Sequence, residues 1–339
     1  MDASQLLSAH ELAAGSLNHM HIESRTDSGM VLRLDCTDGT GKIRVYSLFP
    51  GILLAFNDFE ASSVSSYGGE INQGLKLNYC VEGRCEILMS DDFCLCLEPG
   101  DLSIDTREVN NLFSFPGGRY HGVELFFHRT ALQETPPRLF RDMGIDVPAI
   151  GKKFCPDRQS FIGPAHEKIK NIFMTMNNPP LECETAYYRI KVTELLLLLN
   201  CMNFPAKNEC RSFLTMGQTE IARQVMATIT ADLSKRHSME KLAEGYGISP
   251  ASLRNYFRSV YGKSMPAYLH EARMSMAATA LKETGRTIAD IAAAAGYENA
   301  SKFAAAFKAA TGHNPLEYRR QYRCLLTNST PCSAFLAPN

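Results

Sequence analysis

A short pattern occurs twice near the C-terminal end of this chain, and it constrains the fold more than any other feature. The first copy is Ser238–Gly262 (SMEKLAEGYGISPASLRNYFRSVYG) and the second is Thr287–Gly312 (TIADIAAAAGYENASKFAAAFKAATG). An internal repeat points to one structural unit used twice, and missing it would lead to a wrong architecture. The spacing of apolar residues inside each copy indicates what that unit is.

Each copy predicts two short helices joined by a tight turn. In the first copy, apolar residues recur at the three- and four-residue spacing of one helix face on both sides of Gly247. Glycine suits a turn with positive φ, and Ser249–Pro250 is a good start for the next helix. In the second copy Thr287 and Asp290 form a capping-box pattern, and Gly296 supplies the turn. Either copy alone could be an ordinary helical hairpin, but two copies favour the helix-turn-helix, whose second helix enters the major groove of DNA.

The repeats and their surroundings resemble the DNA-binding domain of the AraC/XylS family of bacterial transcription regulators. The resemblance covers residues 218–323 and includes Arg273-x3-Ala277-x3-Leu281 and Gly312-x2-Pro315-x2-Tyr318-Arg319. It implies an all-α C-terminal domain with two helix-turn-helix motifs joined by a linking helix, expected at Tyr268–Leu281, and a structural role for Arg273. The chain departs from the family pattern at Pro266, one residue later than usual, which leaves the start of the linking helix open.

The family motif, matched position by position, assigns roles to residues of the two second helices. The expected base-reading residues of the first copy are Ala251, Ser252, Arg254 and Asn255, and Arg258 is expected on a phosphate. Arginine can bond guanine and asparagine can bond adenine through paired hydrogen bonds. The second copy offers three residues expected at or near phosphates, namely Ser301, Lys302 and Lys308. Phosphate contacts fix register without reading sequence, so we expect specificity mainly from the first copy. The alternative for each residue is a solvated surface side chain.

The distribution of charge agrees with a DNA-binding C-terminal region. The chain has 339 residues, enough for two domains, and a net charge of −1. Residues 218–323 contain 15 Lys+Arg and 9 Asp+Glu, a net charge of +6, whereas the remainder has a net charge of −7. A basic domain beside an acidic one is expected if only the former meets a polyanion.

The period of the sequence changes between about residues 40 and 130. Short β-favouring segments alternate with turn signals there, at Ile43–Leu48, Ile52–Phe56, Leu75–Val81, Cys85–Met89, Phe93–Leu97, Leu102–Asp105, Leu112–Phe115 and Val123–Phe127. Many short strands indicate a sandwich or small barrel. Val81-Glu82-Gly83, Glu98-Pro99-Gly100-Asp101 and Tyr120-His121-Gly122 resemble the cupin-like sensor domain found before AraC-type DNA-binding domains. The resemblance implies a β-barrel that encloses an unidentified small-molecule effector; the alternative is a filled barrel that only dimerises.

The same region offers weak candidates for metal or redox chemistry. His121, Glu124 and His128 lack the spacing of the metal ligands of enzymatic cupins, and His19 and His21 alone are too few for a site. Cys94 and Cys96 share a strand face, but their spacing matches no usual zinc pattern, so buried thiols are the simpler interpretation. We therefore expect no metal, no cofactor and no enzymatic activity.

The expected organisation is an α+β multidomain chain. Residues 1–202 form a sensor and dimerisation domain, with helices at about 160–202, namely Ala165–Met176 and Ala186–Met202. The second of these is apolar around most of its circumference, so it packs inside its own domain or against a second subunit. Residues 131–159 contain four prolines and predict irregular structure with one short helix around Arg138–Met143. A linker follows at 203–217, then the DNA-binding domain at 218–323 and a disordered tail at 324–339.

The sequence thus predicts a cytoplasmic, effector-responsive transcription regulator, with activation favoured over repression. Its expected partners are double-stranded promoter DNA, RNA polymerase, a small-molecule effector and a second copy of the chain. No targeting segment or membrane span is evident, and eleven scattered cysteines indicate reduced thiols. The alternative is a DNA-binding regulator that responds to no ligand.

Overall fold

The computed structural model describes residues 20–327, except 27–28, 37, 66–73, 90–92, 107–108, 157–159 and 204–213. His19, most of the expected linker and residues 328–339 of the expected tail therefore lie outside the described residues. The chain divides into two compact units, Met1–Met216 and Gly217–Asn339, which are described separately.

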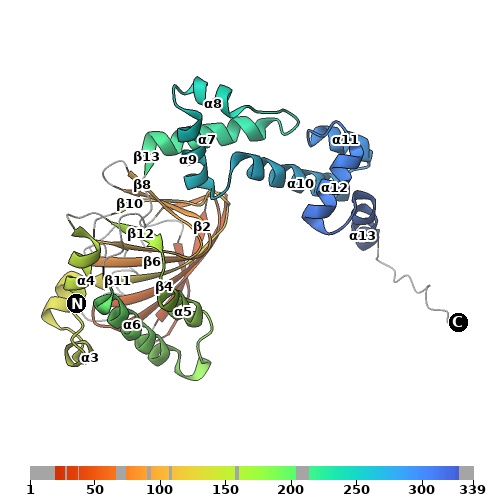
Figure 1. The fold of residues 1–339 in the computed structure, drawn as a ribbon. Helices are drawn as coiled ribbons and strands as arrows, with labels where there is room; N and C mark the ends of the chain where they lie inside the picture. Colours follow the sequence, from red (N-terminus) through yellow and green to blue (C-terminus); the bar gives the residue numbers. More distant parts are fainter. Residues whose placement is uncertain are drawn as a thin grey trace. The chain divides into compact units, whose positions relative to one another are not determined.

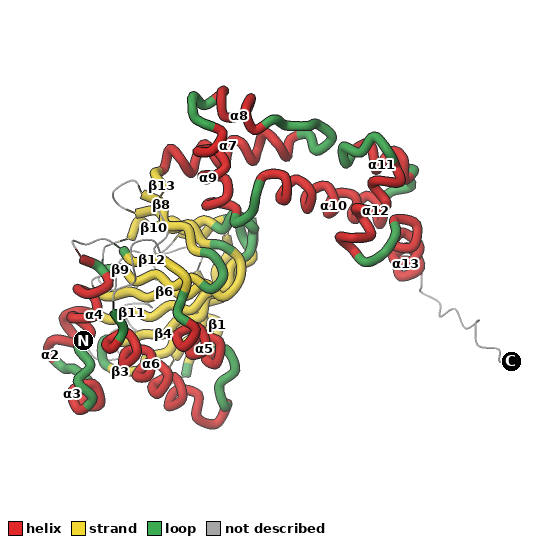
Figure 2. Tube along the Cα trace, in the orientation of Figure 1, coloured by secondary structure: helices red, strands yellow, loops and turns green. Residues whose placement is uncertain are grey.

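The first unit is built from antiparallel strands that pair into two sheets (Figures 1 and 2). The strands are β1 Met20–Arg25, β2 Gly29–Cys36, β3 Gly39–Phe49, β4 Ile52–Glu60, β5 Ser63–Ser65, β6 Gly74–Gly83, β7 Cys85–Met89, β8 Phe93–Leu97, β9 Asp101–Asp105, β10 Val109–Ser114, β11 Tyr120–His128, β12 Phe161–Pro164 and β13 Leu214–Thr215. The larger sheet has the order β1-β2-β3-β4-β11-β6-β9-β12, and the smaller has the order β13-β8-β7-β10-β5.

The eight predicted strands all exist, and the N-terminal region is β-rich as expected. The sheets begin earlier than predicted, because β1 and β2 occupy a stretch before residue 40, and they also recruit β12 and β13 from later segments. The described strands form two sheets with free edges, not one closed barrel. The likeness to a cupin barrel therefore stays a prediction.

Alternation along the strands creates two separate cores on the two faces of the larger sheet. Leu77, Leu125 and Phe56 project from one face into a cluster shared with the helices. The other face packs against the smaller sheet through a second cluster, which includes Phe59 and Phe115. The helices thus cover one face of the larger sheet and the smaller sheet covers the other.

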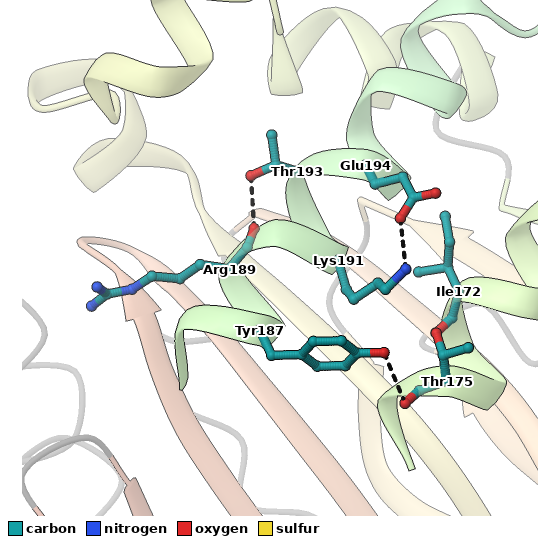
Figure 3. Close-up of polar contacts among 7 residues, drawn as sticks. All are labelled: Ile172, Thr175, Tyr187, Arg189, Lys191, Thr193 and Glu194. Carbon is teal, nitrogen blue, oxygen red and sulfur yellow. Dashed lines mark hydrogen bonds and ion pairs between the residues drawn. The ribbon is translucent and has the colours of Figure 1, made fainter. Parts of the chain in front are cut away.

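Two long helices, α5 Glu167–Met176 and α6 Glu184–Cys201, lie on the helix-covered face, joined through the short 3-10 helix η3 Leu181–Cys183. Tyr79 of β6 stacks on Phe173 of α5 with ring centroids 4.6 Å apart. Figure 3 shows how the polar groups of this pair are satisfied: the Tyr187 hydroxyl donates to the carbonyl of Thr175 at 3.3 Å, and the buried Thr193 hydroxyl donates to the carbonyl of Arg189 at 2.7 Å. One face of α6 is buried within its own unit, at Tyr188, Val192, Thr193, Leu195, Leu196 and Leu199, whereas Ile190 on another face is exposed.

Three short helices occupy the segment predicted to be irregular: α2 Arg129–Glu134, α3 Arg138–Asp142 and α4 Val147–Phe154. The prediction of one helix there was too low, because prolines were interpreted as breaks. Proline is tolerated in the first turn of a helix, and Pro148 stands there in α4, where the Asp146 side chain caps the amide of Ala149 at 3.0 Å.

The second unit is entirely helical in its described part. Its elements are α7 Met216–Ala231, α8 Met239–Gly245, α9 Pro250–Tyr261, α10 Met265–Glu283, α11 Ile288–Ala294, α12 Ala300–Thr311 and α13 Pro315–Thr327. The helix α10 starts at Met265, capped by Ser264 and with Pro266 in its first turn, so the shifted proline fits a normal helix start. The helix α13 continues four residues past 323.

Candidate nucleic-acid interface

The first helix-turn-helix is formed by α8 and α9, and local capping explains both of its helices. Ser238 accepts a hydrogen bond from the amide of Lys241 at the start of α8, and Ser249 accepts one from the amide of Ser252 at 3.0 Å. Between them Gly247 has a φ of 66°, which other residues rarely adopt. The helix α9 ends at Gly262, also left-handed.

One face of α9 is buried and the other is open. Leu253, Phe257 and Val260 are at most 1% exposed. The outward residues recur at helical spacing and line one open depression of the surface, at Ala251, Arg254, Asn255 and Arg258. Within the described residues, no hydrogen bond or ion pair engages the side chains of Arg254, Asn255 and Arg258.

Ser252 differs from the other predicted base readers. It is half-buried, and its hydroxyl lies 2.9 Å from the hydroxyl of Ser249, the cap of the same helix. A contact from Ser252 to a base would have to preserve or replace this bond.

Glu240 of α8 is a neighbour of Arg254 that sequence reasoning missed. Its pKa is lowered, first by the hydrogen bond from the Ser238 hydroxyl at 2.6 Å and less by the positive charge of Arg254. The guanidinium of Arg254 thus has a carboxylate in its surroundings. The helical period could have assigned Glu240 and Arg254 to the neighbouring helices α8 and α9, but it could not have shown that the two charges interact.

The second helix-turn-helix is formed by α11 and α12. The predicted capping box is present, with the Thr287 side chain accepting from the amide of Asp290 and the Asp290 carboxylate accepting from the amide of Thr287. The Thr287 hydroxyl also donates to the Asp290 carboxylate at 2.7 Å, and this bond, followed by that from the Thr287 amide, lowers the pKa of Asp290. The side chain of Asn299 caps α12, and Phe303 and Phe307 are fully buried.

The outward face of α12 is chemically simpler than that of α9. Ser301, Lys302 and Lys308 are exposed, as is Ala305, whereas Ala304 is half-buried. Neither lysine forms an ion pair with a residue that the structure describes. This face offers two free positive charges and little that could distinguish one base from another.

Arg273 of α10 joins the segment between α7 and α8 to the turn of the second motif, in agreement with a structural role. Its Nε donates to the carbonyl of Leu233 at 2.8 Å and its Nη2 to the carbonyl of Lys235 at 2.8 Å. Gly296, in the turn of the second motif, has a φ of 76°, and a Cβ there would lie 3.0 Å from Nη2 of Arg273. The absence of a side chain at Gly296 lets this guanidinium lie between the α7–α8 segment and the second motif.

Two of the candidate metal ligands of the first unit, Glu124 and His128, each form hydrogen bonds with a different partner. The carboxylate of Glu124 accepts from Asn78 at 2.9 Å, and burial raises its pKa. The Nδ1 of His128 accepts from the amide of Ala131 and so caps α2. Four residues along a strand are roughly 13 Å apart, so Glu124 and His128 cannot share one ion. No three His, Cys, Asp or Glu side chains in the described ranges are grouped as metal ligands.

Three cysteines of the strands, Cys80, Cys85 and Cys96, have thiols whose pKa is raised. Burial raises the pKa of Cys80 to about 12, and it raises the pKa of Cys85 well above its ordinary value. The pKa of Cys96 is raised by a hydrogen bond with Cys94 and by burial. Reactive and metal-binding cysteines need accessible thiolates, so packing is the role that the structure gives these residues. None of the described helices is long and apolar enough to cross a membrane.

Two helix-turn-helix motifs on a shared linking helix, with open and partly basic second helices, define a DNA-binding protein. A family model described as "Helix-turn-helix domain" matches residues 242–321. The HTH-type transcriptional activator AarP of Providencia stuartii is 30% identical over 105 residues, which cover 31% of this chain and 78% of AarP. The HTH-type transcriptional activator RhaR of Pectobacterium carotovorum is 33% identical over 98 residues, which cover 29% of this chain and 34% of RhaR.

Among solved structures, the C-terminal domain of AraT, a response regulator from Geobacillus stearothermophilus, is similar with 33% identity and a TM-score of 0.29, covering 30% of this chain and 84% of that one. The chain spans about a third of the length of the first curated relatives it matches. The chain belongs to the AraC family of transcription regulators, and its likeness to these relatives lies in the C-terminal helix-turn-helix region.

Proposed function

We propose that this chain is a sequence-specific regulator of transcription that binds double-stranded promoter DNA with α9 and α12. The outward face of α9 carries the proposal, because Arg254, Asn255 and Arg258 are exposed and unbonded among the described residues. Leu253 and Phe257 anchor the opposite face and fix the orientation of these side chains. The two second helices would enter successive major grooves, about 34 Å apart.

In this proposal the two helices have unequal tasks. Ala251, Ser252, Arg254 and Asn255 face base edges, and Arg258 meets a phosphate. Ser301, Lys302 and Lys308 position the domain on phosphates, because the face of α12 has no long side chain with a base-specific hydrogen-bond pattern. Specificity then depends mainly on α9.

We further propose that the first unit makes the regulator responsive to a small-molecule effector and brings two copies together in the cytoplasm. Activation through RNA polymerase is favoured, since AarP and RhaR are both named transcriptional activators. An effector acts only through a difference in affinity between two conformations. We also propose that the first unit has a cupin-like fold. The proposal includes no catalytic role.

A regulator that responds to no ligand is the alternative, and one observation favours it. The space between the two sheets contains a stack of aromatic rings, with Phe59 and Phe115 centroids 5.1 Å apart and Phe115 and Tyr120 centroids 5.1 Å apart. Rings packed in this way leave less room for an effector between the sheets, so an effector would need another place in the unit.

The test is the affinity of the full chain for its own upstream DNA, compared with random DNA of equal length over a range of salt. Specific binding should be tighter by about 10³ or more. Replacing Arg254 by Ala should weaken the binding free energy for the specific site by about 1–3 kcal/mol and reduce the preference for one base at a single position of that site. Replacing Lys302 by Ala should weaken both DNAs alike and reduce the salt slope by about 1.

Lys170→Ala supplies the control, because Lys170 is an exposed lysine of α5 in the first unit. It should leave both affinities unchanged. Equal losses on specific and random DNA for Arg254→Ala would contradict base reading by α9. Absence of binding at low salt would contradict the whole proposal.

A further inference from the structure

A cavity of about 450 Å³ lies at one end of the larger sheet, on the face covered by helices. Its walls come from the ends of β6 and β11 and from the helices α2 and α4. Buried apolar side chains line it, namely Leu75, Phe127, Leu132 and Val147. They belong to the core between the sheet and the helices, so the cavity is separate from the space between the two sheets. Its volume is in the range of about 300–1,000 Å³ typical of ligand pockets.

The charged residues that line this cavity are both positive. Arg129, the first residue of α2, and Lys152, in the last turn of α4, both line it and are both exposed. The described lining includes no Asp or Glu, and neither cation forms an ion pair with a described residue. Two cations that line one cavity, with no described counter-ion, create a positive potential that favours an anion. Arginine also binds carboxylates through two parallel hydrogen bonds.

Gly151 keeps one wall of the cavity open. It lies inside α4, where glycine costs roughly 0.5–1 kcal/mol relative to alanine. A Cβ at this position would lie 3.4 Å from Cγ2 of Thr106 and 3.6 Å from Cδ1 of Leu75. Both neighbours line the cavity, so any longer side chain at Gly151 would grow into this space.

The helix α4 also holds the end of α6. Lys153, next to the cavity residue Lys152, donates from Nζ to the carbonyls of Leu199 at 3.1 Å, Asn200 at 2.6 Å and Met202 at 3.0 Å. These carbonyls lie at the C-terminal end of α6. The last turn of α6 contains no basic residue of its own, so Lys153 of α4 supplies the positive charge there. In the sequence, residues 202–213 connect the end of α6 to β13, which directly precedes α7. A ligand that shifts α4 would therefore change how the end of α6 is held.

We propose that this cavity binds a small organic acid, with its carboxylate at Arg129 and Lys152 and its apolar body against Leu75, Phe127 and Leu132. Binding acts through α4 and Lys153 on the C-terminal end of α6. The inference rests on the proposed role of the first unit as a sensor, and it places the effector outside the space between the sheets.

Isothermal titration of the full chain with sodium octanoate and sodium benzoate tests the binding step. Octanol and benzyl alcohol are the neutral counterparts, and inorganic phosphate tests for binding of an anion without an apolar body. At least one acid should bind, with its alcohol at least tenfold weaker. The double variant Arg129→Gln/Lys152→Gln should bind the acid at least tenfold more weakly, and Gly151→Leu should block it. Lys170→Gln is the matched control, and circular dichroism verifies that each variant is folded.

Hydrogen exchange of the same samples tests the coupling. The acid should slow amide exchange in peptides that cover residues 197–202, and Lys153→Met should abolish that change while acid affinity stays within about threefold. Binding of neither acid at millimolar concentration, equal binding of acids and alcohols, phosphate binding as tight as that of the acids, or an unaffected double variant would each overturn the proposal. An acid that binds as described but does not alter DNA affinity would instead contradict the sensor role of the first unit.

Discussion

Arg273 allows a quantitative test of what holds the segment between α7 and α8 against the second motif. Its guanidinium donates to the carbonyls of Leu233 and Lys235, both at 2.8 Å, and lies against Gly296. Hydrogen bonds to charged groups contribute about 1.5–3 kcal/mol each, but Arg273 is half-buried, so solvent screening reduces the sum. We expect Arg273→Ala to destabilise the second unit by about 2–3 kcal/mol. Since about 1.4 kcal/mol corresponds to a tenfold change in an equilibrium constant, the equilibrium constant for opening of the second unit should rise about 30- to 150-fold.

Hydrogen exchange followed by mass spectrometry is the appropriate assay, because it reports on the second unit within the full chain. Peptides covering the end of α7, α10 and α11 should lose protection by that factor, while peptides of the first unit should not change. Arg273→Lys should recover only part of the protection, since an ammonium cannot reproduce the forked geometry of a guanidinium. Glu271→Ala is the control, because Glu271 is an exposed residue of the same helix that pairs with Lys263 at the surface. Equal effects of Arg273→Ala and Glu271→Ala would refute the reasoning.

Three further predictions concern single groups. The lowered pKa of Asp290 means that its contribution to stability is complete above the unfolded pKa and is lost as the pH falls through the folded pKa. Asp290→Asn should therefore destabilise the second unit at neutral pH and progressively less in acid, and a difference independent of pH in denaturation curves would contradict this. Because the pKa of Cys80 is about 12 and its thiol is buried, iodoacetamide at pH 8 should label it at least ~100-fold more slowly than the exposed Cys183, as measured by mass spectrometry of digests. Phe257→Ala should lower the free energy of unfolding of the second unit by about 3–5 kcal/mol, since Phe257 is 1% exposed and its ring centroid lies 4.8 Å from that of Tyr261. Retention of the wild-type thermal transition of the second unit would show that this packing is unimportant.

The sequence by itself determined the helical motifs of the second unit, because their signals are local. Caps such as Ser249 and the Thr287–Asp290 pair act on amides two or three residues away, and the turn glycines need only their own φ. The apolar period then decides which side of α9 is buried, so the exposure of Arg254, Asn255 and Arg258 followed without any knowledge of tertiary contacts. The eight strands predicted between residues 40 and 130 were found for the same reason.

Only the tertiary structure decided what depends on residues far apart in the chain. Strand pairing is long-range, so the alternating pattern could not reveal whether the strands close into a barrel or pair into two sheets. The start of α4 at Val147, with Pro148 in its first turn, was hidden because proline signals both breaks and first turns. Arg129 and Lys152 line one cavity only because α2 and α4 pack on the same end of the larger sheet, and Lys153 reaches carbonyls at residues 199–202 for the same reason. A linear pattern records periodicity and capping, whereas the meeting of distant side chains depends on packing that no short segment specifies.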